Sequence, residues 1–243
     1  MLSPSYKSQA VRPMKCLEAG FALVKDQYWL LTGVTAVGML LASLAPLGIL
    51  QGPMLCGIYL VLFARMRGER IEFGLVFKGF DYFLESLIAT LVQLGLAVLV
   101  MLPSIAAFLA IFFVMLPDNQ AGGGGPPVAR TFFFFLVVGL LFLVTFALML
   151  VIWVLCAFVY PLIVDRKLTG LAAIKASVTA GRANFWGLLG LVALNGLLGI
   201  VGVTCCYVGV FFVLPICFAA LAHAYREVFG LTTEPPPAFV PVG

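Results

Sequence analysis

The sequence predicts an all-α protein, a polytopic transmembrane helix bundle of six spans with two amphipathic connector helices at the cytoplasmic interface. Of its 243 residues, 63% are hydrophobic and only 10% are charged, whereas a soluble domain carries about 25% charged residues. The charged residues form a few clusters, and long uncharged stretches separate them. This composition excludes a soluble enzyme, a nucleic-acid-binding protein and a disordered chain.

Four uncharged stretches set the expected number of spans. They cover residues 27–64, 86–117, 131–164 and 183–225. A membrane helix needs about 20 apolar residues. The first and last stretches are therefore expected to hold two helices each, joined by a short turn, and the middle two one long helix each.

Proline, glycine and glutamine mark the turn in the first stretch. Pro46, Gln51 and Pro53 predict helices over residues 28–45 and 50–64. In the last stretch we expect the turn at residues 199–204, with the fifth helix starting near Phe185 and the sixth ending near Tyr225.

The two long helices, over residues 86–116 and 131–164, exceed a hydrocarbon core of about 30 Å. We expect them to tilt, protrude or kink, and Pro103 and Pro161 are the expected kink sites. An alternative splits each segment at its proline into re-entrant pieces, which protein would have to shield from lipid.

The basic residues predict the orientation. With six spans, every Lys and Arg except Arg130 lies on one side of the membrane, together with both termini. The positive-inside rule makes that side cytoplasmic.

The expected organisation is a cytoplasmic segment over residues 1–27, a membrane domain over 28–230 and a cytoplasmic proline-rich tail over 231–243. We expect an uncleaved first helix rather than a signal peptide, because Pro46 would directly follow the cleavage site.

Both cytoplasmic connectors have the pattern of amphipathic helices. In the second, Leu168, Leu171, Ile174 and Val178 recur every three or four residues. The candidate lipid-interface residues there are Lys167, Lys175, Arg182 and Trp186. A helix packed on the cytoplasmic ends of the bundle is the alternative. The first connector, residues 71–83, carries four phenylalanines and is also expected to lie flat in the interface.

The two connectors end alike. Val, Gly and Phe occupy the same relative positions in residues 76–83 and in residues 178–185. Coincidence and an internal duplication both explain this likeness. In either case we expect Gly79 and Gly181 to permit the bend into the bilayer, and the phenylalanine after each to anchor the turn at headgroup level.

Few residues inside the expected spans could carry chemistry. No ionisable residue falls in a predicted hydrocarbon core, and Gln93 and Asn195 are the candidate polar packing residues. Interhelical hydrogen bonding is their expected role, and lining a substrate path is the alternative. Glycine and alanine recur every third residue from Gly187 to Gly202, which predicts close packing against more than one neighbour.

No catalytic, cofactor-binding or metal-binding residues are expected. The sequence has one histidine, His223, and no nucleotide-binding or metal-binding motif. Catalysis would have to use charged residues at the cytoplasmic interface, namely Asp81, Glu85, Asp165 and Arg182.

Most of the six cysteines are expected to be small apolar packing residues, and vicinal Cys205 and Cys206 lie near an outer turn. The outer loop, residues 117–127, is expected to be a flexible link.

Short motifs resemble a family. The stretches at residues 52–59, 67–69 and 77–80, and at 160–165, 172–177 and 181–185, resemble a loose group of uncharacterised bacterial inner-membrane proteins. This group is related to the membrane domain fused to some glycerophosphodiester phosphodiesterases. The resemblance covers residues 28–230 and implies a six-helix bundle in the bacterial inner membrane. The phosphodiesterase barrel is absent, because that fold needs about 250 residues.

Two classes of function follow. The first is a non-catalytic membrane protein that organises membrane lipids or packs against a membrane-protein partner or a second copy of the chain. The basic connectors favour it. The second is a small transporter or pore for an apolar or amphiphilic solute, suggested by the proline-interrupted helices. A water-filled cavity lined by Gln93 and Asn195 would favour the second.

Overall fold

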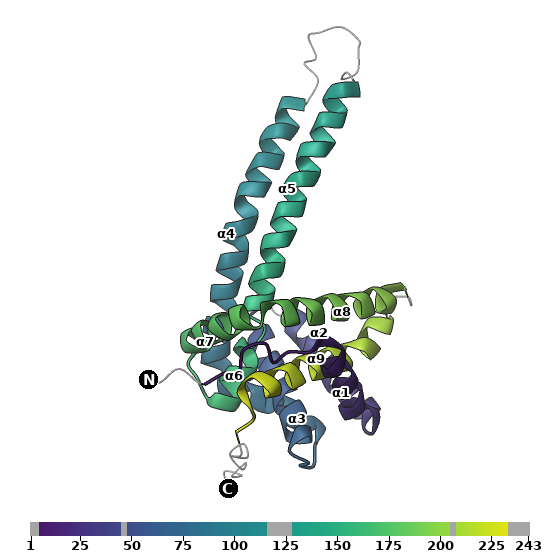
Figure 1. Ribbon diagram of the computed structural model, residues 1–243, viewed down its shortest axis with the longest axis vertical. Helices are drawn as coiled ribbons and strands as arrows, with labels where there is room; N and C mark the ends of the chain where they lie inside the picture. The colour runs from purple at the N-terminus through teal and green to yellow at the C-terminus, as the bar shows by residue number, and fades with distance from the viewer. Residues whose placement is uncertain (1–4, 45–47, 116–127, 205–207, 233–243) are drawn as a thin grey trace. The chain divides into compact units, whose positions relative to one another are not determined.

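The computed structural model describes residues 5–44, 48–115, 128–204 and 208–232, and all regular elements in these ranges are helical (Figure 1). The elements are α1 (Pro13–Lys25), α2 (Tyr28–Leu44), α3 (Gln51–Met66), the 3₁₀-helix η2 (Phe73–Tyr82), α4 (Phe83–Met115), α5 (Val128–Leu155), α6 (Val159–Arg166), α7 (Gly170–Ala183), α8 (Phe185–Thr204) and α9 (Val208–Phe229). They form two compact units. Residues 92–153 make one unit, and residues 1–91 with 154–243 make the other.

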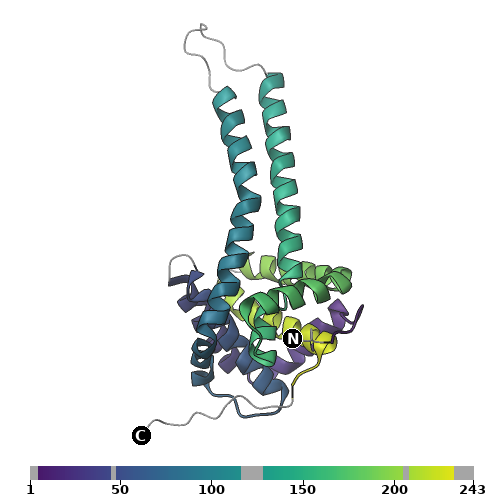
Figure 2. The same cartoon turned by 90° about the vertical axis from the view of Figure 1, so that its left-hand side faces the viewer.

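The smaller unit is a hairpin of the long helices α4 and α5, which run side by side in both views (Figures 1 and 2). The hydroxyls of Ser104 and Thr145 are hydrogen-bonded across the hairpin, and the rings of Phe108 and Phe134 lie 6.4 Å apart. Most of the described side chains on both helices are large, apolar and exposed. Such a surface is stable against lipid rather than water.

The two prolines of the long segments behave differently. Pro103 lies inside α4, which continues through it as one long helix, so the alternative of a split at this residue is wrong. The other segment does break. α5 ends at Leu155, and Pro161 lies in the first turn of α6. Proline has no N–H and its ring would clash with the carbonyl of Ala157, so one continuous helix is unfavourable there.

Ser177 of α7 satisfies the backbone at this break. Its Oγ accepts a hydrogen bond from the Phe158 N–H at 3.1 Å and donates one to the Leu155 carbonyl at 2.8 Å. The Ser177 side chain is fully buried. One hydroxyl therefore replaces the helical hydrogen bonds that the break removes.

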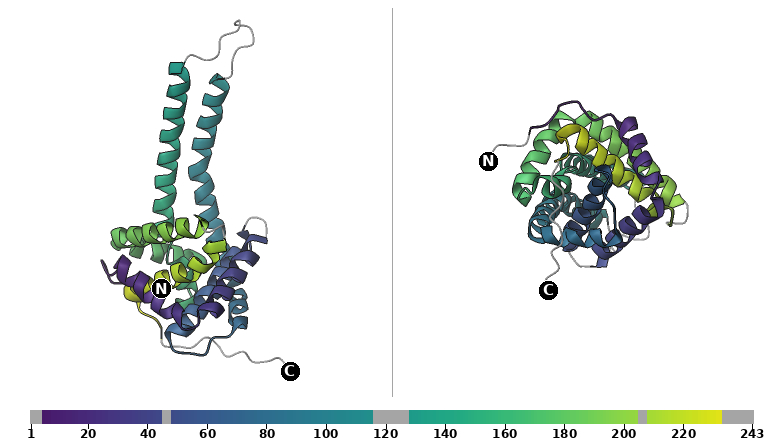
Figure 3. Two further views of the ribbon diagram at one scale, coloured as in Figure 1. Left: turned by 90° about the vertical axis from the view of Figure 1, so that its right-hand side faces the viewer. Right: turned by 90° about the horizontal axis from the view of Figure 1, so that it is seen from below.

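Helix α3 forms the core of the larger unit. Every residue from Gly52 to Ala64 is buried. The helix packs against α2, η2, α6 and α9, and lies among them when viewed from below (Figure 3, right). Glycine makes the contact with η2 possible, since a Cβ on Gly57 would overlap the Val76 carbonyl oxygen. Phe63 of α3 then stacks on Tyr225 of α9, with ring centroids 5.4 Å apart.

The N-terminal segment contains a helix that the sequence reasoning did not identify. α1 buries Cys16, Gly20 and Val24. A Cβ on Gly20 would lie 2.6 Å from the Ala220 backbone nitrogen, so α1 and α9 are in close backbone contact. The axes of α1 and α2 differ by 105°. The segment before the first expected span is therefore packed structure and turns sharply into α2.

The last two helices differ from the expectation in their bounds. α8 continues through residues 199–204, so the expected turn there is wrong, and α9 continues past Tyr225 to Phe229. Gly230, with a φ of 71°, ends α9. Residues 205–207, which separate the two helices and include Cys205 and Cys206, lie outside the described part of the chain.

The glycine series of α8 serves several neighbours, but not along its whole length. A Cβ on Gly187 would overlap the Val11 carbonyl, one on Gly190 would lie 2.9 Å from the Pro13 ring, and one on Gly202 would lie 3.0 Å from Val210. A Cβ on Gly196 or on Gly199 would meet nothing within 4 Å.

Within the described residues, four helical segments are long and apolar enough to cross a membrane. A fifth is added if the bent pair α1 and α2 forms one span. The four segments are Phe73–Phe113, Phe132–Arg166, Phe185–Thr204 and Gly209–Phe229. α3 is also apolar but shorter. These helices suggest a membrane-embedded protein.

Candidate functional site

The candidate lipid-interface residues lie on α7 and at its two ends. α7 packs inward through small residues: Gly170, Ala173, Ser177, Ala180 and Gly181. Of its apolar stripe, Leu171 is 55% exposed, whereas Ile174 and Val178 are half-buried. The small residues let the helix approach its unit closely, while Leu171 stays uncovered.

Two basic side chains share the exposed face of α7 with Leu171. Lys175 and Arg182 follow it at four and eleven residues, which places all three on one side of a helix with 3.6 residues per turn. Both basic residues are exposed. An uncovered apolar residue beside two cations is the arrangement of an interfacial helix.

The other two candidate residues flank α7. Lys167 is exposed and has a φ of 50°, a left-handed conformation that ends α6 and redirects the chain into α7. Trp186, at the start of α8, is 81% exposed. The structure thus places Lys167, Lys175, Arg182 and Trp186 along one continuous segment, all of them exposed.

The first connector has a similar division of faces. η2 buries Val76 and Gly79 against α3. Its phenylalanines are exposed, together with the first residue of α4: Phe73, Phe77, Phe80 and Phe83. As in α7, small residues form the protein contact and large apolar ones stay outside.

The two connector glycines do not bend the chain as expected. Gly181 lies inside α7, and its Cβ would be 3.1 Å from the Cα of Leu155. Gly79 lies inside η2, where a Cβ would overlap the backbone of Pro53 and Gly57. Both glycines therefore allow a close approach to an earlier helix.

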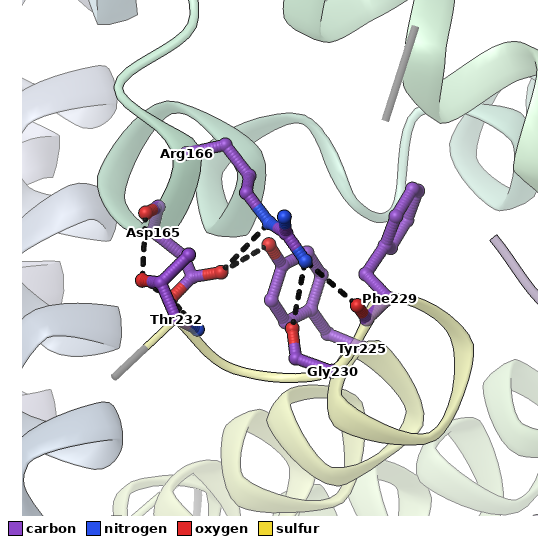
Figure 4. Close-up of polar contacts among 6 residues, drawn as sticks. All are labelled: Asp165, Arg166, Tyr225, Phe229, Gly230 and Thr232. Carbon is purple, nitrogen blue, oxygen red and sulfur yellow. Dashed lines mark hydrogen bonds and ion pairs between the residues drawn. The ribbon is translucent and has the colours of Figure 1, made fainter. Parts of the chain in front are cut away.

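A buried polar cluster joins α6, α9 and the segment after α9 (Figure 4). The side chain of Asp165 is fully buried. It accepts hydrogen bonds from the Tyr225 hydroxyl at 2.7 Å and from the Thr232 hydroxyl at 2.8 Å and N–H at 3.1 Å, and the Nε of Arg166 lies 3.3 Å away. A buried carboxylate with this many donors is a stable structural anchor.

Arg166 extends the cluster to the end of α9. Its Nη2 donates to the carbonyl of Phe229 at 2.7 Å and is 3.4 Å from that of Gly230 (Figure 4). These carbonyls have no further helical turn to bond with. The cluster therefore fixes the C-terminal end of α9 against α6.

Two of the four charged residues weighed for catalysis, Glu85 and Asp165, make structural contacts in separate places. Glu85 accepts a hydrogen bond from the Gly170 N–H at 2.7 Å, which caps the first turn of α7. Asp165 belongs to the cluster above, while Asp81 and Arg182 are exposed. In the described ranges, no group of three or more His, Cys, Asp and Glu residues could hold a metal ion.

The candidate packing amides have different surroundings. Asn195 of α8 donates a hydrogen bond to the Cys217 carbonyl of α9 at 3.4 Å, while its buried Oδ1 has no partner in the described part of the chain. Gln93 lies in α4, and its Nε2 has no hydrogen-bond partner among the described residues. An interhelical hydrogen bond is thus seen for Asn195.

Sequence reasoning missed Asn184, which is 3% exposed. It lies between α7 and α8, accepts a hydrogen bond from the Ala10 N–H at 2.8 Å and donates one to the Lys7 carbonyl at 2.9 Å. An Asn between two helical patterns signals a turn, but its partners are more than 170 residues away in sequence. Sequence spacing alone could not identify them.

No known protein family, curated protein or solved structure matches the chain. Its class therefore follows from the helices themselves. Their length and apolar surfaces suggest a membrane-embedded protein.

Proposed function

We propose that the chain is a multi-pass protein of the bacterial inner membrane that binds and organises anionic lipid at the cytoplasmic interface without catalysing a reaction. Six spans, formed by α2, α3, α4, α5 with α6, α8 and α9, place both termini and the connectors η2 and α7 in the cytoplasm. The distribution of Lys and Arg, with only Arg130 on the opposite side, supports this topology. The resemblance of short motifs to bacterial inner-membrane proteins agrees with the location.

The exposed face of α7 carries the proposal. Leu171 and the basic residues Lys175 and Arg182 stay uncovered although α7 has a well-packed inner face. A surface-lying helix with this composition inserts its apolar residues at the acyl boundary and holds its cations among anionic headgroups.

Aromatic side chains support the same placement. All three tryptophans of the chain, Trp29, Trp153 and Trp186, are more than 60% exposed. Tryptophan is enriched at the headgroup level of membranes, where its ring and N–H meet apolar and polar surroundings. The exposed phenylalanines of η2 offer a second apolar surface at the cytoplasmic connectors.

A membrane-protein partner or a second copy of the chain is the alternative occupant of these exposed faces. The transporter alternative needs a water-filled cavity lined by Gln93 and Asn195.

The test compares two charge variants of α7. Lys175→Glu combined with Arg182→Glu should reduce the anionic lipid recovered with the purified protein, since each basic residue near an anionic surface contributes about 1 kcal/mol. Lys175→Arg combined with Arg182→Lys keeps the charge and should recover lipid like the parent. Mass spectrometry of the bound lipid and thermal unfolding are measured on both. Unchanged anionic lipid in the double Glu variant would contradict the proposal.

A further inference from the structure

A basic cavity lies between the N-terminal segment, α1 and the C-terminal end of α9. Its volume is about 460 Å³, within the range of ligand pockets. Four of its residues are basic and one is acidic. The lining residues that carry charge are Lys7, Arg12, Lys15, Arg226 and Glu227.

The wall of this cavity is held in place by hydrogen bonds to α9 and to Asn184. The Lys7 N–H donates to the Val228 carbonyl at 2.8 Å. The Asn184 side chain bonds to the same segment: it donates to the Lys7 carbonyl and accepts from the Ala10 N–H. Gln9 between them has a φ of 54°, which turns the segment sharply. The basic side chains thus project from a fixed backbone, which favours specific binding.

The positive charge of the cavity is largely uncompensated. The ion pairs in the described part of the chain involve Arg65, Arg67 and Arg166, none of which lines the cavity. Burial raises the pKa of the Cys16 thiol, so this cysteine stays neutral and adds no negative charge. His223 also lines the cavity, is 7% exposed, and its Nε2 has no hydrogen-bond partner among the described residues.

The N-terminal end of α1 adds an attraction for anions. Arg12, Lys15 and Cys16, at the first turn of this helix, line the cavity. The first turn has no acidic residue and Arg12 makes no side-chain capping bond. Pro13 at the helix start has no N–H, so the attraction comes from the positive end of the helix dipole, which favours anions at such positions.

The geometry of α1 indicates where the anion comes from. α1 makes an angle of 105° with α2, so it lies close to the membrane plane if α2 spans the bilayer. On its outer side Met14 is 58% exposed and Phe21 is 56% exposed. A helix in the interface with outward apolar residues places its neighbouring cations at headgroup level.

We propose that this cavity binds the phosphate group of an anionic lipid headgroup, with Arg12, Lys15 and Arg226 as the cationic ligands. The inference rests on the proposed function for the location of the cavity at the cytoplasmic interface. The cavity differs from the face of α7 in how it binds lipid. The face of α7 attracts many lipids weakly, whereas the cavity holds one molecule.

The test uses the full chain in nanodiscs of phosphatidylcholine and phosphatidylglycerol, followed by mass spectrometry of lipid retained after transfer to detergent. The pocket variant is Lys15→Gln with Arg226→Gln, and its matched control is Lys175→Gln with Arg182→Gln on α7. We expect the parent and the α7 control to retain one phosphatidylglycerol, and the pocket variant to retain it roughly tenfold less. Glu227→Gln removes the acidic side chain of the cavity and should increase the amount of phosphatidylglycerol retained. Misfolding cannot cause such an increase, so this variant tests the site independently of any loss of fold in the pocket variant.

Competition with inorganic phosphate distinguishes the two sources of the anion. If the site takes lipid, phosphate in the buffer leaves the retained phosphatidylglycerol in place. If phosphate alone binds and no lipid is retained by the parent, the lipid assignment is overturned. Retention by the pocket variant equal to the parent would overturn the site. Failure of the proposed function is seen separately, as unchanged bulk anionic lipid in the charge-reversed α7 variant.

Discussion

Small polar side chains hold the described part of this protein together where its helices break or end. Ser177 bridges the interruption between α5 and α6, Asn184 ties the N-terminal segment to the α7–α8 junction, and Asp165 joins α9 to α6. All three are buried. In surroundings this apolar, an unpaired backbone group is expensive, so each of these side chains stabilises the fold through the groups that it satisfies.

Removing the Ser177 hydroxyl should destabilise the protein. Ser177→Ala leaves the Phe158 N–H and the Leu155 carbonyl without this partner, and we expect a loss of about 1–3 kcal/mol in the free energy of unfolding. Thr179→Ala is the matched control, because the Thr179 hydroxyl is exposed and bonds only to Lys175 within its own helix. Thermal unfolding in detergent compares the two. Equal stability of both variants would show that another group satisfies the break.

At the scale of elements, the connectors show that an apolar stripe does not identify the packed face of a helix. The buried residues of α7 and η2 are glycine, alanine, serine or valine, while Leu171 of α7 and the phenylalanines of η2 are exposed. In water this would be unfavourable, because burial of apolar area drives packing. Beside lipid the apolar residues gain little by facing protein, and close backbone contact favours small residues instead.

The amides of α8 and α4 should respond differently to replacement. Asn195→Leu removes the bond to the Cys217 carbonyl, and we expect a destabilisation of about 0.6 to 2 kcal/mol. Gln93→Leu removes an amide whose Nε2 has no described partner, so its stability should stay the same or rise. Unfolding midpoints of the two purified variants measure the difference. A larger loss for Gln93→Leu would indicate a partner or a ligand for this side chain.

At the scale of the whole molecule, the proposed topology makes opposite predictions for two loops. In a background without native cysteines, Gly123→Cys should react with an impermeant thiol reagent added outside intact cells, because it lies in the outer loop. Lys167→Cys should react only after the membrane is opened, because it lies at the cytoplasmic connector. Gly123 is outside the described residues, so labelling tests the loop directly. The reverse pattern of reaction would contradict the proposed orientation.

Much of the helical architecture was predictable from apolar length and proline position. Helices were expected over residues 28–45 and 50–64, and α2 and α3 lie there. The helical second connector and the long helix through Pro103 were also expected. The bounds of α8 and α9 were not, because glycine weakens a helix only modestly and packing against a neighbour compensates. α1 was missed because its segment was assigned to the cytoplasm from its charges, and the spacing of its apolar residues was not considered.

The sequence by itself determined the class of this protein and the exposed position of its candidate lipid-contacting residues. Uncharged stretches of this length favour helices whose backbone groups bond internally, and flanking cations favour one orientation. Only the tertiary structure decided which face each connector packs, which hydroxyl closes the α5–α6 break, and that Lys7, Arg12 and Arg226 surround one cavity. These features join residues far apart in the chain, and helical periodicity carries information only about residues within a few turns of each other.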